Sequence, residues 1–263
     1  MSLEFIIIIV AFIAGGMAVS YFQARSAEKQ EPSGHAAPEA QPPEQFPPQQ
    51  PHTEQRAQPA AERASNDWAL ASSGLASIPV TLALIAACIL IALLSNLGQS
   101  REVLDPLYIA DPDSPGFGAI LGGELWRLIT PAFIHFGVMH LAFNMIWLWD
   151  LGGLLERKKG HLSLLGLVLA IGIAANLAQY IITASPYFGG MSGVVYGLLG
   201  YVWMHGRVNP RFGVILSQQT VVIMLAWFVL CWLGMLGPIA NWAHTAGLAM
   251  GVALGARKPD RAG

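Results

Sequence analysis

Among the polar side chains that lie in apolar stretches of this 263-residue chain, four carry the groups that acyl transfer needs. They are Ser192, His244, His140 and Asn144. A polar group at membrane depth is costly, so its presence there favours a role in function. A serine hydroxyl becomes a nucleophile when a general base takes its proton. The sequence therefore predicts a site in which Ser192 is the nucleophile and His244 is its general base.

The sequence around Ser192, FGGMSGVVYG, is rich in glycine. Gly190 and Gly193 let the backbone turn tightly and approach a substrate closely. A serine at the start of a helix is also an ordinary N-cap, whose hydroxyl accepts a hydrogen bond from a backbone N–H of the same helix. A glycine-flanked serine alone does not choose between these interpretations.

His140 and Asn144 are four residues apart, so they share one face of a helix. Both side chains donate hydrogen bonds, and opposite Ser192 they would stabilise an oxyanion together with the Ser192 backbone N–H. The alternative is that they join neighbouring helices by hydrogen bonds. We favour the oxyanion hole. For His135, in the same apolar segment, we expect structural hydrogen bonds to a neighbouring loop.

Other partners for Ser192 are excluded by position. All four lysines lie outside the apolar segments, which removes a Ser–Lys dyad from a buried site: Lys29, Lys158, Lys159 and Lys258. Asp150 follows His140 by ten residues, which is about 15 Å along a helix. We therefore expect Asp150 near the inner end of its helix, close to Arg157, in a structural role.

A dyad without an acid requires another way to orient the base. Tyr196, one helical turn after Ser192, is the ring that we expect to pack against His244. No HExxH zinc helix is present, and His135 and His140 are five residues apart, a poor spacing for a metal pair on a helix. We expect neither a metal nor another cofactor.

The elements that must position these residues are membrane helices. Hydrophobic residues make up 54% of the chain and charged residues 11%, against about 25% charged in an average soluble domain. No alternating pattern of barrel strands is present, so helices must satisfy the backbone in lipid. The predicted fold class is an all-α, multi-pass membrane helix bundle. A net charge of −2 gives no indication of a nucleic-acid partner.

Seven apolar segments are predicted, at residues 5–22, 78–97, 134–153, 162–182, 191–206, 219–237 and 241–256. Residues 1–25 are predicted to form an uncleaved transmembrane anchor, because this stretch has no basic n-region and carries Glu4. Residues 26–70, rich in Pro, Gln, Glu and Ala, bury too little to offset their ordering entropy and are predicted to form a disordered linker. Residues 71–263 hold the other six segments and form the core.

The Lys and Arg residues predict the orientation of the chain. Of the 14, twelve flank the linker, follow the segments 134–153 and 191–206, or lie near the end of the chain. With the linker in the cytoplasm, only Arg101 and Arg127 face outward, as the positive-inside rule requires. The C-terminus is then cytoplasmic, and the N-terminus lies outside if residues 5–22 span.

Two predicted helices are too short to cross the hydrocarbon. Residues 192–205 span about 21 Å, against about 30 Å of hydrocarbon, and residues 242–256 are similarly short. Both begin on the outer side, so Ser192 and His244 share one depth below the outer surface. Small residues, which allow close approach of helices in lipid, recur every four positions beside His244: Ala243, Gly247, Gly251 and Gly255. We predict tight packing that sets Ser192 against His244.

A long outward connection, residues 98–133, precedes the helix of His140. Its second half is apolar and contains the adjacent pair Trp126 and Arg127. Tryptophan is common at the headgroup boundary, so an interfacial anchor is one interpretation. The other is that the loop lies partly in the membrane and shapes access to the site.

Three blocks of sequence stand in a recognisable order: GELWRLITPAFIHFGVMHLAFNMIWLWDLGGLLE, FGGMSGVVYGLLGYVW and NWAHTAGLAMG. They resemble the rhomboid intramembrane serine proteases, nearest to the bacterial GlpG type, over about residues 78–256. The resemblance implies a six-helix core and the Ser192–His244 dyad. It also implies an oxyanion hole made by His140, Asn144 and the Ser192 amide.

The resemblance further implies that Tyr196 stacks on the catalytic histidine, that Trp126 and Arg127 belong to a membrane-embedded first loop, and that Glu156 is a structural acid. The implied substrates are transmembrane segments, cut near their outer end after a small residue, in the bacterial inner membrane. The chain departs from the pattern at Asp150, where an aromatic residue is usual, and in the first loop, where a proline, residue 131, replaces a histidine.

Two other functions are less consistent with the sequence. Inactive relatives that hold transmembrane clients without cutting them typically lack the serine or the histidine, and both are present here. A small-molecule transporter would favour an internal repeat, and the sequence shows none between its halves.

Overall fold

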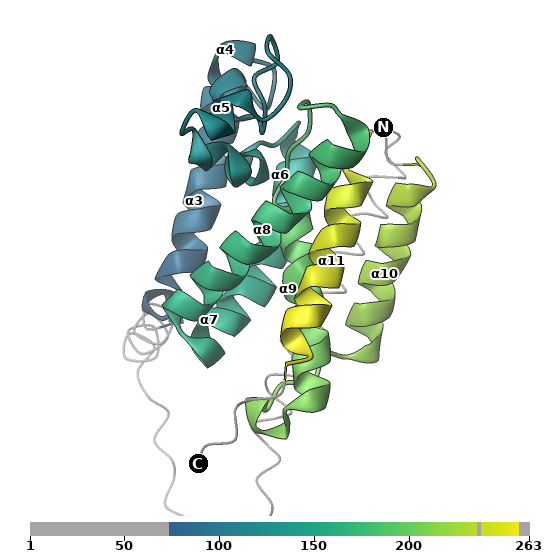
Figure 1. The fold of residues 1–263 in the computed structure, drawn as a ribbon. Helices are drawn as coiled ribbons and strands as arrows, with labels where there is room; N and C mark the ends of the chain where they lie inside the picture. The colour runs from purple at the N-terminus through teal and green to yellow at the C-terminus, as the bar shows by residue number, and fades with distance from the viewer. Residues whose placement is uncertain (1–73, 236–237, 258–263) are drawn as a thin grey trace, which may run out of the picture. The chain divides into compact units, whose positions relative to one another are not determined.

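The computed structural model describes residues 74–235 and 238–257, and every regular element in these ranges is a helix (Figure 1). The predicted anchor, residues 1–25, and the predicted linker, residues 26–70, lie outside the described residues. Within the described ranges the predicted all-α fold class is confirmed.

Long helices account for the six predicted core segments: α3 (Pro79–Leu94), α6 (Val138–Trp147) continued by the π turn η4 (Leu148–Gly152) and α7 (Gly153–Lys159), α8 (His161–Thr183), α9 (Ser192–Val208), α10 (Gln218–Trp232) and α11 (Asn241–Gly255). Two helical stretches, Val138–Lys159 and His161–Thr183, are long and apolar enough to cross a membrane. The helices α3 and α10 are also apolar but shorter.

The helix that carries His140 differs from the segment predicted at 134–153. It begins only at Val138, after Gly137, whose φ of 95° is a conformation that L side chains rarely adopt. His135 therefore lies in the turn before the helix and not on it. The helix continues past residue 153 to Lys159. The predicted segment ended too early because hydropathy falls at the charged residues there, although the backbone stays helical.

The helix that begins at Ser192 is also longer than predicted, with 17 residues. It passes His205, which is buried and whose Nδ1 lies 3.2 Å from the carbonyl oxygen of Gly255 in α11. His205, at which the predicted short helix ended, is thus buried inside the protein, and the helix continues past it to Val208.

The helix α9 forms the centre of the bundle, and all its residues from Gly193 to Val202 are buried. It packs most closely on α11, through glycine. A Cβ at Gly247 would collide with the carbonyl oxygen of Gly193, and a Cβ at Gly251 would collide with that of Gly197. Because glycine at these positions lets the two backbones touch, the predicted tight packing of the two short helices is confirmed.

The buried Glu156 of α7 joins this helix to the start of α3. Its carboxylate accepts hydrogen bonds from the Val80 N–H at 2.7 Å, the Thr81 N–H at 2.8 Å and the Thr81 hydroxyl at 2.6 Å. His161 Nδ1 lies 2.7 Å from the same carboxylate. A carboxylate at a helix N-terminus satisfies backbone donors and interacts favourably with the helix dipole, so Glu156 has the structural position that the resemblance implies.

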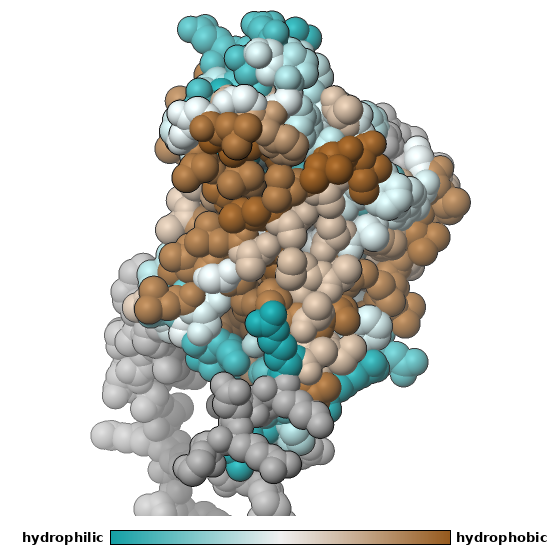
Figure 2. All heavy atoms as spheres, in the orientation of Figure 1, coloured by the Kyte–Doolittle hydropathy of each residue, from teal (hydrophilic) through white to brown (hydrophobic). Residues whose placement is uncertain are grey.

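Apolar side chains cover the sides of the bundle. On the face drawn in Figure 2, a broad hydrophobic zone crosses the middle, with hydrophilic residues towards the two ends. Large residues are exposed on separate helices, among them Leu93 on α3, Ile181 on α8 and Val222 on α10. Large apolar side chains exposed on several helices fit lipid as the solvent of the bundle.

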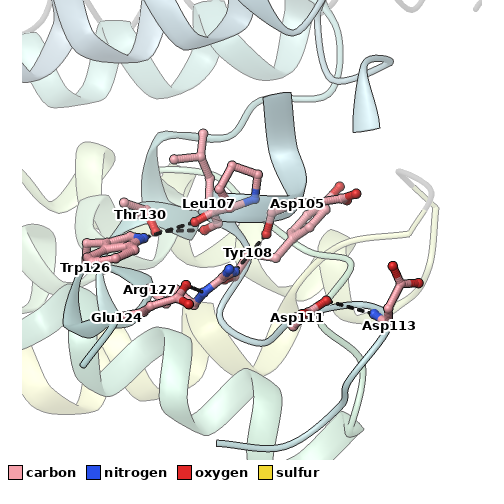
Figure 3. Close-up of polar contacts among 10 residues, drawn as sticks. Asp105, Leu107, Tyr108, Asp111, Asp113, Glu124, Trp126, Arg127 and Thr130 are labelled. Atoms are coloured by element: carbon pink, nitrogen blue, oxygen red, sulfur yellow. Dashed lines mark hydrogen bonds and ion pairs between the residues drawn. The ribbon is translucent and has the colours of Figure 1, made fainter. Parts of the chain in front are cut away.

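Residues 98–133 fold into short helical turns: α4 (Arg101–Leu104), η1 (Asp105–Leu107), α5 (Gly118–Leu121), η2 (Leu125–Leu128) and η3 (Thr130–Phe133). Arg127 is buried among them, and its guanidinium donates to the carbonyl oxygens of Asp105 and Tyr108 and to the carboxylate of Glu124 (Figure 3). The Trp126 indole N–H donates to the Pro106 carbonyl oxygen at 3.1 Å, and half of the Trp126 side chain stays exposed. Both predicted supporting residues therefore hold this loop together.

Candidate active site

Ser192 and His244 meet where α9 and α11 begin. The Ser192 Oγ and His244 Nε2 atoms are 2.7 Å apart, a hydrogen bond between residues separated by 52 positions in the chain. Ser192 is the first residue of α9, and the preceding Met191 takes the N-cap position without a side-chain capping bond. The Ser192 hydroxyl is thus engaged by His244, which disfavours the N-cap interpretation.

The His244 ring is held by packing. It lies against Tyr196, with ring centroids 4.8 Å apart and an angle of 42° between the planes. The Tyr196 hydroxyl donates to the Met224 carbonyl oxygen of α10 at 3.3 Å, which fixes that ring in turn. Among the described residues His244 Nδ1 is buried and has no hydrogen-bond partner. Within that part of the chain no acid therefore orients the His244 ring through Nδ1.

His140 lies on the other side of Ser192, across Gly190. The backbone N–H of Phe136 donates to His140 Nδ1 at 3.2 Å, so in the neutral ring the proton is carried on Nε2. A Cβ at Gly190 would lie 2.7 Å from His140 Nε2 and 3.5 Å from Ser192 Oγ, and the φ of Gly190 is 123°. Only glycine leaves room for the histidine N–H to face the region of the serine hydroxyl.

Asn144 is buried on α6, one turn below His140. Its amide nitrogen donates to the His140 carbonyl oxygen at 2.8 Å, a bond within its own helix. The alternative role for Asn144 was a hydrogen bond to a neighbouring helix. Among the described residues, the Asn144 amide makes no such bond. An amide nitrogen carries two hydrogens, so one donor remains for another acceptor.

The backbone segment directly before Ser192 is held by hydrogen bonds to residues in the loop before α6. The Gly190 N–H donates to the Pro131 carbonyl oxygen at 3.0 Å. His135 is fully buried, with Nδ1 3.1 Å from the Phe133 carbonyl oxygen and Nε2 accepting from the Met191 N–H at 3.4 Å. His135 thus makes the structural hydrogen bond to the loop that was expected of it, at Phe133, and a second one to Met191, the residue directly before Ser192.

Two buried polar residues of α8, Asn176 and Gln179, were missed by the sequence analysis. The Asn176 amide donates to the Leu128 carbonyl oxygen at 2.9 Å. The Gln179 side-chain oxygen accepts from the backbone N–H groups of Trp242 and Ala243, at the start of the His244 helix. The same criterion that selected His140, a polar side chain within an apolar segment, applies to both and would have found them.

Residues 122–259 match the family model described as a rhomboid domain. The match includes both members of the hydrogen-bonded pair, the histidine across Gly190, and every helix from α6 to α11. It covers more than half of the 263 residues. This chain therefore belongs to the rhomboid family of intramembrane serine proteases.

Proposed function

We propose that this chain is a serine endopeptidase that cleaves transmembrane segments of other membrane proteins near the outer face of the membrane, through a Ser192–His244 dyad. The observation that carries the proposal is the 2.7 Å contact between Ser192 Oγ and His244 Nε2 at the starts of two tightly packed helices. A nucleophile and a base within hydrogen-bond reach are the first geometric requirement for this chemistry.

In the proposed mechanism the neutral imidazole of His244 takes the Ser192 proton while the hydroxyl oxygen attacks the peptide carbonyl carbon. The C–N bond then breaks as the same imidazole, now charged, returns its proton to the leaving amine. Water attacks the resulting ester with His244 again as base, which releases the acid product and restores Ser192. The packing of Tyr196 against His244 supports a base that keeps its orientation through both half-reactions.

The oxyanion that forms in each half-reaction needs donors close to Ser192 Oγ. As the first residue of α9, Ser192 has a backbone N–H without an acceptor inside the helix. His140 Nε2, which carries the proton, provides a second donor beside Gly190. Asn144 provides a third through its second amide hydrogen. Donors that are fixed before the reaction stabilise developing charge without reorganisation.

The depth of the site supports cleavage near the outer face. With 17 and 15 residues, α9 and α11 span about 25 Å and about 22 Å, less than the roughly 30 Å of the hydrocarbon core. Their far ends lie next to basic residues, among them Arg207 and Arg257. If those ends are cytoplasmic, both dyad residues lie below the outer surface, where water enters from above.

The orientation and location are part of the proposal. The chain is placed in a bacterial inner membrane with its C-terminus in the cytoplasm, as the excess of Lys and Arg at that end favours. Residues 1–25 form an anchor, with the N-terminus periplasmic if residues 5–22 span. Residues 26–70 link the anchor to the protease core, residues 71–263.

The test is cleavage of a transmembrane reporter by the purified wild-type chain and by the Ser192→Ala and His244→Ala variants. Wild type should cut the reporter within its membrane segment, and both variants should insert and fold but leave it intact. A fluorophosphonate probe should label the wild-type chain at Ser192. Cleavage that persists in Ser192→Ala would refute the dyad, and a wild type that binds reporters but neither cuts nor labels would identify a non-catalytic holder of clients.

A further inference from the structure

One side chain of α8, that of Gln179, accepts hydrogen bonds from the backbone at the start of α11. The Gln179 Oε1 atom accepts hydrogen bonds from the Trp242 N–H at 3.1 Å and from the Ala243 N–H at 3.2 Å. The first N–H groups of a helix have no acceptor in their own helix, and such groups are costly to leave unpaired in apolar surroundings. Gln179 is buried, so it satisfies two of these donors away from water.

Gln179 belongs to a row of α8 residues that faces both helices of the dyad. At four-residue spacing the row is Ile171, Ala175 and Gln179, one face of a helix. A Cβ at Gly197 would collide with Ile171, and a Cβ at Gly193 would lie 2.9 Å from the Ala175 Cβ. This face of α8 therefore packs on α9, and one turn further out it reaches α11 through Gln179.

The backbone that Gln179 holds is the backbone that sets the position of the base. Ala243 directly precedes His244, and the Ala243 carbonyl oxygen lies 3.2 Å from the position of a Cβ at Gly193. Gly193 in turn directly follows Ser192. A shift of the start of α11 relative to α8 and α9 therefore changes the distance between His244 Nε2 and Ser192 Oγ.

We propose that Gln179 is a positioning residue for the protease reaction. By accepting from two consecutive backbone N–H groups, Gln179 fixes the position of α11 along its axis relative to α8. It thereby holds His244 Nε2 within hydrogen-bond reach of Ser192 Oγ. A displacement of about 1 Å in a reacting geometry is enough to lower a rate by about 100-fold. The proposal rests on the proposed function, since it assigns a role in the same dyad.

The variants that test it remove or keep the accepting oxygen. Gln179→Met has a similar shape without the oxygen, and Gln179→Glu keeps an oxygen that accepts from both N–H groups. Tyr180→Phe is the matched control, because it removes a partly buried hydrogen bond from the neighbouring residue of α8. Tyr180 Oη accepts from the Gly116 N–H at 2.6 Å, a bond that does not involve the backbone of α11.

Three quantities should be measured on the full chain in detergent or bilayers: kcat and KM on a transmembrane reporter, the rate of fluorophosphonate labelling at Ser192, and the midpoint of thermal unfolding. All rates are taken well below the lowest midpoint. Gln179→Met should lower kcat and the labelling rate by about 10-fold to 100-fold with KM little changed. Gln179→Glu should recover most of both rates. Tyr180→Phe should lower the unfolding midpoint but leave both rates near wild type.

Wild-type kcat and labelling in Gln179→Met would overturn the inference, as would an equal loss in Tyr180→Phe, which would identify a general effect of loosening α8. If Gln179→Met does not fold, Gln179→Asn, whose amide is one methylene too short, must show the same loss of labelling. A Ser192→Ala sample run in parallel separates the two proposals. Cleavage by that variant defeats the proposed function, whereas its inactivity together with full labelling of Gln179→Met or Gln179→Asn defeats only the role of Gln179.

Discussion

The imidazole of His244 rests against the ring of Tyr196, with centroids 4.8 Å apart, while among the described residues its Nδ1 atom has no hydrogen-bond partner. In a triad an acid accepts from that nitrogen and fixes the tautomer and the orientation of the ring. Here the orientation comes from a ring contact and from the packing of α11 on α9. The base should therefore be sensitive to the shape of residue 196 more than to its hydroxyl.

Tyr196→Phe and Tyr196→Leu separate the ring from the hydroxyl. Tyr196→Phe keeps the ring against His244 and loses only the 3.3 Å bond to the Met224 carbonyl oxygen, so kcat should stay within a few-fold of wild type. Tyr196→Leu removes the flat surface and should lower kcat by about 10-fold to 100-fold. The check is steady-state cleavage of a transmembrane reporter, and an equal effect of the two variants would show that the hydroxyl, not the ring, matters.

Gly190→Ala should inactivate the protein. The added Cβ would lie 2.7 Å from His140 Nε2, so the proposed oxyanion donor must move, and loss of one such donor lowers kcat by about 100-fold to 1,000-fold. The positive φ adds a strain of about 1 kcal/mol to 2 kcal/mol. The measurement is kcat together with the free energy of unfolding.

Gly116→Ala is the control for the strain in Gly190→Ala. Gly116 has a similar φ of 118°, and nothing lies within 4 Å of a Cβ built there. It should therefore lose a comparable amount of stability and keep its activity. If Gly116→Ala is as inactive as Gly190→Ala, backbone strain and not the contact with His140 explains the loss.

The pairing of Ser192 with His244 was predictable because it depends on lengths and spacings along single helices. Two short apolar segments that open on one side, with small residues every fourth position, leave few ways to pack. The bonds of Gln179 to Trp242 and Ala243 were not predictable in this way. They join residues 63 and 64 positions apart and depend on the height of one helix against another, which periodicity does not report.

The loop before α6 shows a second limit. Hydropathy placed His135 on the same helix as His140, but Gly137 starts the helix after His135. The buried His135 ring then contacts Phe133 of this loop through one nitrogen and the Met191 N–H, before α9, through the other. From the sequence, Arg127 is interpreted as a charged residue at the membrane boundary. Only the folded loop shows that its guanidinium donates hydrogen bonds to carbonyl oxygens 19 and 22 residues earlier in the chain.

Gly247→Ala and Gly251→Ala should separate α11 from α9. The new Cβ of each meets a carbonyl oxygen of α9, that of Gly193 or Gly197, and backbone does not yield as a flexible side chain does. We expect a loss of about 1 kcal/mol to 3 kcal/mol in the free energy of unfolding, with a loss of fluorophosphonate labelling at Ser192.

Gly166→Ala is the matched control for these two substitutions. Gly166 lies within α8 and is exposed, with nothing within 4 Å of an added Cβ. Alanine favours the helix over glycine by roughly 1 kcal/mol, so this variant should unfold at a slightly higher temperature and remain active. Wild-type stability in Gly247→Ala would contradict the close approach of the two backbones.

Arg127→Leu should loosen residues 98–133 while the helices stay folded. Its buried guanidinium makes three hydrogen bonds within the loop, and each bond to a charged group is worth about 1.5 kcal/mol to 3 kcal/mol. Limited proteolysis should therefore cut the variant within residues 98–133 much faster than wild type. Arg101→Leu is the control, because Arg101 is exposed and its guanidinium carbon lies 5.7 Å from the Tyr187 ring centroid, a weak cation–π contact. Equal proteolysis of both variants would show that the loop does not depend on the buried guanidinium.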